Sequence, residues 1–157
     1  MDFDTLQSIR HLLRDVRVLS LAVVVDGEAE AALLPFAASA DCSAVYVQAS
    51  GLARHARGLV SGASVGILIH EAVTPPMDPM QVPRLSIRAV VTILERDAPT
   101  FAAARDRFVA RFPAAAITLE LGDFNLYELG LGRGRYVEGF ARAFNVGAET
   151  FQELAGL

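Results

Sequence analysis

Three basic side chains stand close together in the segment SGLARHARG, where Arg54, His55 and Arg57 follow Ser50 within seven residues. A serine before a helix can cap the first turn through its hydroxyl, and the free N–H groups and dipole of a helix N-terminus attract anions. A forked guanidinium group also matches the oxygen atoms of a phosphate. The spacing therefore indicates a phosphate site, and the alternative is a solvated basic face on a short helix.

The flanking residues predict how this basic segment is held in place. The stretch 45–49 alternates as in a strand, 52–60 follows helical spacing, and 65–69 is a continuous apolar run. We therefore expect a strand, a short helix that begins at Ser50 and is capped by Gly62, and a second strand.

A long strand is predicted further along the chain, over 84–95. Its alternation sets Arg84, Ser86 and Arg88 on the face opposite to Ile87. If that polar face looks toward the helix at Ser50, Arg88 becomes a second phosphate ligand. If it looks toward water, Arg88 is an ordinary strand arginine.

The remaining patterns predict a hairpin and an amino-terminal helix. Residues 4–15 have helical apolar spacing with Asp4 or Thr5 able to cap the start, and strands are expected over 18–25 and 28–36. Asp26-Gly27 between them is a typical two-residue hairpin turn. Pro35 cannot donate a ladder hydrogen bond, so it predicts an edge, a bulge or an opening in the sheet.

The second half of the chain adds a loop, a helix and a further strand pair. Three prolines in 72–82 predict a long irregular loop, and 100–112 predicts a helix that begins after Pro99 and ends at Pro113. The segment 121–140 is interpreted as two strands joined by a glycine-rich turn. The sum is a mainly β fold with helices (α+β), an antiparallel barrel of about six strands in a single domain over 1–157.

Composition excludes several function classes. No lysine occurs and the net charge is −4, which argues against nucleic-acid binding; Cys42 is the only cysteine, so no intrachain disulfide can form. His11, His55 and His70 lack the spacing of a metal site, so we expect none. The apolar fraction of 53% favours a homodimer. No run is long enough for a membrane span, and the amino terminus lacks the layout of a secretion signal, so we expect a cytoplasmic location without membrane association.

Several segments together resemble a known family. The run SGLARHARGLVSGASVGILI resembles the S-x-L-A-x-H-T-x-N-L segment of the haem-utilisation (HugZ-type) branch of the pyridoxamine 5′-phosphate oxidase-like FMN-binding split barrels. The likeness continues in the same order through PRLSIRA, RFP, GDFNLYEL and VEGFARAF, and it covers most of the chain. The resemblance implies an FMN-binding split barrel, with sites formed between the two subunits of a homodimer.

The resemblance also implies which residues hold the cofactor. The flavin would lie along Leu34, Pro35 and Phe36, and its phosphate would be held between Ser50 and Arg57. The partner subunit would close over the ring with its terminal segment, which includes Phe140 and Arg142. The whole cofactor-binding set that we expect is Leu34, Pro35, Phe36, Gln48, Ser50, Arg54, His55, Arg57, Arg88, Phe140 and Arg142, with no catalytic residue assigned.

Three functions follow from this resemblance. The first is an FMN-binding protein, and more specifically a flavin-dependent oxidoreductase of unknown substrate, in which the flavin supplies the chemistry. The second is a haem-binding or haem-utilisation protein of the same fold. It ranks below FMN because the haem-degrading members are expected to ligate iron with a tail histidine, and none follows His70. The third is a cofactor-free dimer, motivated by Ala56 and Gly58, which replace polar residues of the family.

Overall fold

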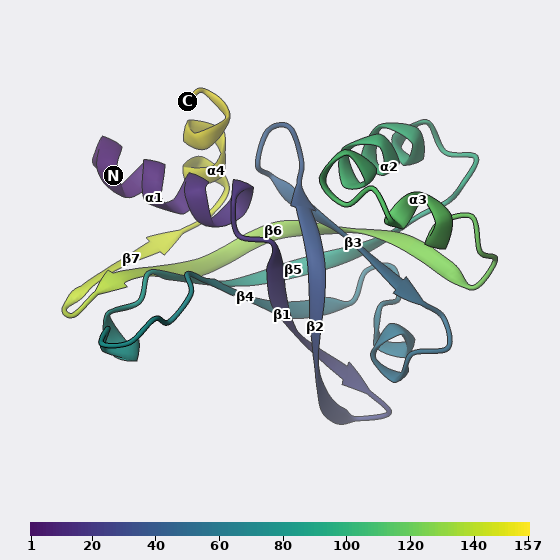
Figure 1. Cartoon of the computed structure of the whole chain (residues 1–157), viewed down its shortest axis with the longest axis horizontal. Coiled ribbons are helices and arrows are strands. Elements are labelled where there is room, and N and C mark those ends of the chain that lie inside the picture. The colour runs from purple at the N-terminus through teal and green to yellow at the C-terminus, as the bar shows by residue number, and fades with distance from the viewer.

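The computed structural model describes residues 1–157 as seven strands and a few short helices (Figure 1). The strands are β1 (Val18–Val25), β2 (Glu28–Ala38), β3 (Ala44–Ser50), β4 (Ser64–His70), β5 (Arg84–Leu94), β6 (Phe124–Gly139) and β7 (Arg142–Val146). The α-helices are α1 (Phe3–Arg14), α2 (Pro99–Arg111), α3 (Ala115–Thr118) and α4 (Ala148–Ala155), and the 3-10 turns are η1 (Arg54–Gly58) and η2 (Pro79–Gln81).

Six of the strands close into an antiparallel barrel. Their order is β3-β2-β1-β4-β5-β6, and β3 pairs with β6 from Ala44↔Gly130 to Ser50↔Phe124. β7 pairs only with the second half of β6, so it extends the sheet beyond the barrel. α1 and α4 lie side by side at one end of the barrel, and α2 and α3 lie at the other end (Figure 1). The predicted α+β class and six-stranded split barrel are confirmed.

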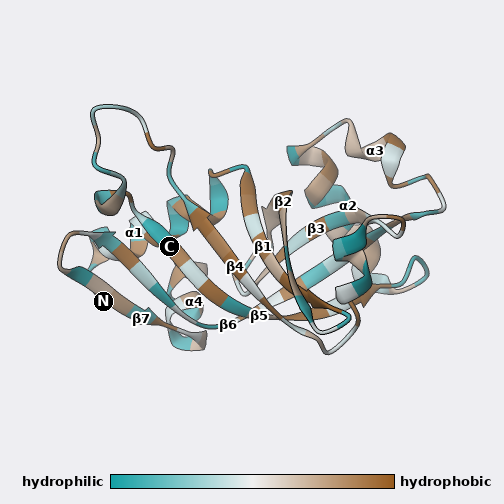
Figure 2. Ribbon diagram, turned by 90° about the horizontal axis from the view of Figure 1, so that it is seen from below, coloured by the Kyte–Doolittle hydropathy of each residue, from teal (hydrophilic) through white to brown (hydrophobic).

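The core fills the inside of this barrel. Alternate residues of each strand point inward, as β5 shows with Leu85, Ile87, Ala89 and Val91 all buried. Hydrophobic (brown) segments run along β1 and β4 in Figure 2. A second, smaller cluster lies between α2, α3 and the outer side of the sheet, where Phe101 and Phe108 pack on Leu126. Cys42 is fully buried, as expected for a structural residue.

The predicted hairpin turn is confirmed, whereas the cap of the first helix and the conformation of the loop 72–82 are corrected. The turn at Asp26-Gly27 has φ of 53° and 80°, which is the left-handed conformation that this hairpin needs. α1 is capped by Asp2, whose carboxylate accepts a hydrogen bond from the Thr5 N–H at 2.8 Å, so the expected caps at Asp4 or Thr5 were wrong. The loop 72–82 was expected to be irregular, but it contains one turn of 3-10 helix, η2. The Asp78 carboxylate caps this turn by accepting a hydrogen bond from the Met80 N–H.

Pro35 lies where β2 changes its partner. It is the last β2 residue that pairs with β1, opposite Val18, and Phe36 pairs with Val47 of β3. The missing N–H of proline falls at this change of partner, so no continuous ladder is interrupted. The expectation of an irregular point in the sheet is therefore confirmed at the place where β2 bends from one neighbour to the next.

The glycine-rich segment LGLGRGRY is not a turn, which corrects the sequence interpretation. β6 runs through it without interruption, and the chain reverses instead at Phe140-Ala141, where Ala141 has φ of 64°. Gly132 and Gly134 lie in the middle of the strand because β5 approaches them closely. A Cβ on Gly134 would stand 2.3 Å from the Ser86 carbonyl oxygen and 2.9 Å from the Ile87 Cα.

We expect Gly134→Ala to destabilise the protein, because its methyl group would push β5 and β6 apart at a backbone carbonyl. Overpacking of this kind typically costs about 1–3 kcal/mol in the free energy of unfolding. Urea unfolding followed by circular dichroism measures the change. Gly122→Ala is the matched control, since a Cβ there meets no atom within 4 Å; equal losses in the two variants would show that the close approach of β5 is not the cause.

The loop between β2 and β3 depends on one carboxylate. Asp41 accepts hydrogen bonds from the hydroxyls of Ser39 and Ser43 at 2.6 and 2.8 Å and from the Ser43 N–H at 3.1 Å. These bonds, the Ser39 bond first, lower the pKa of Asp41 to about 2.

A depressed carboxylate pKa means that the ionised Asp41 stabilises the fold above about pH 4, and that this contribution is lost as the pH falls toward 2. We therefore expect Asp41→Asn to lower the free energy of unfolding at pH 6 by no more than about 1 kcal/mol, since solvent screens this exposed loop. The difference between wild type and variant should shrink between pH 4 and pH 2 in urea titrations. A difference that stays constant over this range would contradict the assignment.

Candidate functional site

Ser50 ends β3 but does not cap a helix. Its Oγ donates to the Asp123 carboxylate at 2.7 Å and accepts from the Leu52 N–H at 3.2 Å. The helix after it is only the 3-10 turn η1, which follows Ala53 without a side-chain cap. The expected helix from Ser50 to Gly62 is therefore wrong, because a residue 73 positions away in the sequence takes the serine hydroxyl. Gly62 does have a left-handed φ of 86°, in the turn that leads into β4.

The two arginines of the basic segment are already paired. Arg54 bonds Glu30 through Nε and lies 3.3 Å from Glu28, and Arg57 lies 3.1 Å from Asp26. These acids all come from the β1–β2 hairpin, which η1 contacts. The guanidinium groups that were expected to bind a phosphate thus bind carboxylates in this structure. These ion pairs fix η1 against the β1–β2 hairpin.

His55 and Gly58 complete the description of η1. His55 is half-buried, and its Nε2 atom is buried without a hydrogen-bond partner. Gly58 packs directly on β1, since a Cβ there would stand 2.3 Å from Val23 Cγ2 and 2.6 Å from the Val24 carbonyl oxygen. Glycine at this position is therefore explained by close packing on the barrel.

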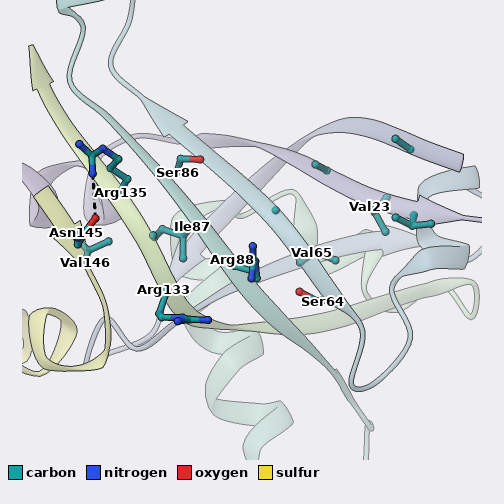
Figure 3. Close-up of a pocket in the computed structure, with 15 residues that line it drawn as sticks. Val23, Ser64, Val65, Ser86, Ile87, Arg88, Arg133, Arg135, Asn145 and Val146 are labelled. Atoms are coloured by element: carbon teal, nitrogen blue, oxygen red, sulfur yellow. Dashed lines mark hydrogen bonds between the residues drawn. The ribbon is translucent and has the colours of Figure 1, made fainter. Parts of the chain in front are cut away.

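Arg88 lies at a different place, in a hollow on the outer face of the sheet that we call the sheet pocket. The hollow has a volume of about 830 Å³ and is bounded by β1, β4, β5, β6 and β7 (Figure 3). Arg88 stands on β5 next to Gly66 of β4, and neither Ser50 nor His55 lines the pocket. The structure therefore does not bring Ser50, His55 and Arg88 together within one chain.

A β-bulge places two more arginines beside Arg88. The pairing of β5 with β6 shifts between Ile87 and Ala89, so Gly132 and Arg133 both lie opposite Arg88. The extra residue reverses the alternation of β6, because an inserted residue turns every later side chain to the other face. As a result Arg133 and Arg135 point outward with Arg88, while Tyr136 is fully buried in the barrel.

These three arginines have no acidic partner. The arginines that form ion pairs in this chain are Arg54, Arg57, Arg105 and Arg142. Arg135 donates to the side-chain oxygen of Asn145 at 3.2 Å, and no aspartate or glutamate lines the sheet pocket. Three unneutralised guanidinium groups on one face form a site for an anion that offers carboxylate or phosphate oxygens.

The register of the strands gives the pocket an apolar side and a cationic side. One row across the sheet runs through Ala31, Ala22, Gly66 and Arg88, and the next runs through Leu33, Ser20, Leu68, Ser86 and Arg135. Within the pocket, these rows place small residues on β1 and β4 and arginine on β5 and β6, whereas Leu33, Ser20 and Leu68 line a neighbouring hollow. The surface therefore matches a flat, apolar molecule that carries its negative charges along one edge.

The other residues expected to bind a cofactor are scattered over the chain. Leu34 and Phe36 are buried in the barrel, with Pro35 half-buried between them. Gln48 accepts from the Thr118 hydroxyl at 3.0 Å under α3. None of these four side chains lines the sheet pocket.

Phe140 and Arg142 lie at the turn between β6 and β7. Phe140 is 84% exposed, and Arg142 pairs with Glu138 at 2.8 Å. Arg88 is thus the one member of the expected set that lines the sheet pocket, while Arg133, Arg135 and Asn145 were missed. The alternating RGR motif would have indicated both arginines had the segment been interpreted as a strand.

The structure contains no cluster of histidine, cysteine, aspartate and glutamate side chains that could hold a metal ion. Its helices are all too short or too polar to cross a lipid bilayer.

Comparison with known proteins identifies relatives over nearly the whole chain, although no protein-family profile matches it. The chain is 28% identical over 151 residues to haem oxygenase HutZ of Vibrio cholerae serotype O1, and the alignment covers 95% of this chain and 85% of HutZ. It also superposes on the crystal structure of HutZ, there called a haem storage protein, with a TM-score of 0.70 and 25% identity over 92% of this chain and 96% of that one.

Two further structures share the fold. A haem-binding protein from Mycobacterium smegmatis superposes with a TM-score of 0.84 and 23% identity, over 98% of this chain but only 62% of that longer chain. A general stress protein 26 relative from Clostridium acetobutylicum, of the pyridoxinephosphate oxidase family, superposes with a TM-score of 0.69 and 10% identity over 96% of this chain and 99% of that one.

Proposed function

Since the chain belongs to the haem-utilisation branch of the pyridoxamine 5′-phosphate oxidase-like split barrels, we propose that it binds haem in the sheet pocket. The observation that carries this proposal is the change from apolar to cationic residues along the rows of the sheet. Haem is a flat apolar ring with two propionates at one edge. A volume of about 830 Å³ lies within the usual range for cofactor sites.

In this arrangement the ring would lie on the small residues Ala22 and Gly66, which leave the surface of the sheet flat. Its propionates would bind Arg88, Arg133 and Arg135, none of which is held by an ion pair. Haem would supply a redox-active iron, whereas the residues of this pocket would supply charge and a flat surface.

We also propose that a second copy of this chain covers the pocket. Large apolar side chains remain exposed on the strands around it, on the same outer face of the barrel: Val24 (61% exposed), Leu33 (68%), Leu68 (37%) and Val90 (53%). Apolar surface in this amount is typical of an interface between subunits. The sheet pocket is open to this face, so a second copy would exclude water from the ring and complete the site.

Titration of the purified protein with haem tests the proposal. We expect saturable binding, seen as a shifted and sharpened Soret band, with one haem for each copy or each pair of copies. Free haem in the same buffer and haem with an unrelated split-barrel protein provide the baselines. A haem spectrum that is unchanged at micromolar protein would contradict the proposal.

FMN, which the sequence analysis ranked first, is the second candidate here, because the relatives named above are described as haem proteins. No histidine lines the sheet pocket, and three unpaired arginines would hold a phosphate as readily as propionates. The same experiment with FMN, followed by quenching of flavin fluorescence, separates the two cofactors. Tighter binding of FMN than of haem would favour a flavoprotein, and an oxidoreductase activity would then depend on the flavin.

A further inference from the structure

A second group of arginines lies away from the sheet pocket, where the end of α1 meets the end of α2. Here a hollow of about 380 Å³, which we call the helix pocket, is lined by charged and very small side chains only. It shares no residue with the sheet pocket. The lining residues are Arg14, Arg107, Arg111, Ala37, Ala38 and Ala110.

Backbone carbonyl groups fix the orientation of these three arginines. Arg111 donates from Nη1 to the Arg14 carbonyl and from Nη2 to the Val16 carbonyl at 2.6 Å. Arg14 donates from Nη2 to the Ala40 carbonyl at 2.6 Å, and Arg107 donates from Nε to the Ala38 carbonyl. Side chains held in this way lose little further freedom when they bind a ligand.

Each of the three guanidinium groups still has donors to spare. The Nε atoms of Arg14 and Arg111 are buried and have no partner. Arg14 Nη1 and both terminal nitrogens of Arg107 make no hydrogen bond within the chain. The buried Nε atoms leave positive charge on Arg14 and Arg111 without an acceptor, and the terminal nitrogens of Arg14 and Arg107 can donate to an acceptor from outside the chain.

No carboxylate neutralises this group. None of the three arginines takes part in an ion pair, and the two acids nearby make their hydrogen bonds to other side chains. Asp15 bonds His11 at 2.8 Å, and Asp41 accepts from Ser39 and Ser43. Arg17 adds a fourth positive charge, as it lies over the Phe112 ring and donates to the Arg111 carbonyl. Burial first and the charge of Arg17 second lower the pKa of Arg111, while the charge of Asp15 acts in the opposite direction.

We propose that the helix pocket binds a compact phosphate-bearing anion. Its guanidinium groups come from two helices, so a tetrahedral group with three acceptor oxygens can accept from more than one of them at once. The alanine walls leave room for more than one phosphate group. This site rests on residues that play no part in the proposed haem site.

Calorimetric titration with inorganic pyrophosphate tests this proposal, at an ionic strength held constant with chloride. We expect saturable binding by the wild type and at least tenfold weaker binding by Arg107→Gln. This substitution removes the free terminal nitrogens but keeps an amide that can donate to the Ala38 carbonyl. Arg107→Lys, which keeps the charge without the fork, should lie between the two.

The matched control is Arg105→Gln, on the same helix, whose arginine faces Asp106 and Glu120. It should bind pyrophosphate like the wild type. Because the arginines of the sheet pocket can also attract phosphate, the titrations are repeated with Arg88→Gln added to each variant, and the loss caused by Arg107→Gln should persist there. Equal losses in Arg105→Gln and Arg107→Gln would overturn the proposal, as would no saturable binding by a wild type that is folded by circular dichroism. Citrate that binds more tightly than pyrophosphate would overturn the assignment to phosphate.

Discussion

Arg133→Gln and Arg88→Gln should each weaken haem binding by roughly 10- to 100-fold. Each substitution removes a charge-assisted hydrogen bond to a propionate, which is worth about 1.5–3 kcal/mol, and every 1.4 kcal/mol corresponds to a factor of ten in affinity. The effect should be large because neither arginine has an ion pair within the chain that could share its charge. Soret titrations at fixed ionic strength measure the dissociation constants.

Two comparisons make this prediction specific. Arg105→Gln removes the same charge from α2, where the arginine does not line the sheet pocket, and should leave haem affinity unchanged. Haem dimethyl ester, which lacks the propionate charges, should bind the wild type and Arg133→Gln equally. If the ester shows the same loss as haem in Arg133→Gln, the arginine acts on the fold rather than on the propionates.

Leu33→Asp should abolish self-association and, with it, tight haem binding. Leu33 is 68% exposed on the outer face of β2 and lies in one row with Ser20 and Leu68, so its burial by a second copy would remove a large apolar side chain from water. Burial of one leucine contributes about 1.5–3 kcal/mol, and each mutation would occur twice in a symmetric interface. Sedimentation velocity should show a dimer for the wild type and a monomer for the variant.

Ile117→Asp provides the control for this experiment. Ile117 is 72% exposed on α3, which contributes no residue to the sheet pocket, so its substitution should leave the dimer intact. A wild type that sediments as a monomer at all concentrations would contradict the proposal that a second copy covers the sheet pocket. A Leu33→Asp variant that remains dimeric would place the interface on another face.

Local patterns predicted most of the barrel because each strand follows the period-two alternation of its own residues. The hairpin at Asp26-Gly27 and the strand that carries Arg88 are examples, since turn chemistry and alternation act over a few residues. The segment through Gly132 and Gly134 was misinterpreted for a physical reason. Glycine permits tight turns but also permits close approach of a neighbouring strand, and only the position of β5 decides between the two.

The candidate site was harder to predict, because tertiary contacts decide which charges stay free. Arg54 is as basic as Arg88 in the sequence, yet Glu28 and Glu30 pair with it from a hairpin more than twenty residues away. Ser50 likewise gives its hydroxyl to Asp123. The alternating RGR motif places Arg133 and Arg135 on one face of a strand, but only the bulge turns that face to the side of Arg88. The resemblance to split-barrel proteins predicts the fold, whereas only the tertiary contacts decide which arginines have no acidic partner.

A chemical-shift map of the bound cofactor tests the central claim most directly. In ¹⁵N–¹H spectra, gallium(III) protoporphyrin, a diamagnetic analogue of haem, should shift the amide signals of Gly66, Arg88 and Gly134 more than any others within one chain. Signals of η1 (Arg54–Gly58), whose arginines are paired with acids of the β1–β2 hairpin, should move less than these in the wild type. Wild-type shifts that centre on Ser50 and His55, with Arg88 and Gly134 unmoved, would contradict the account.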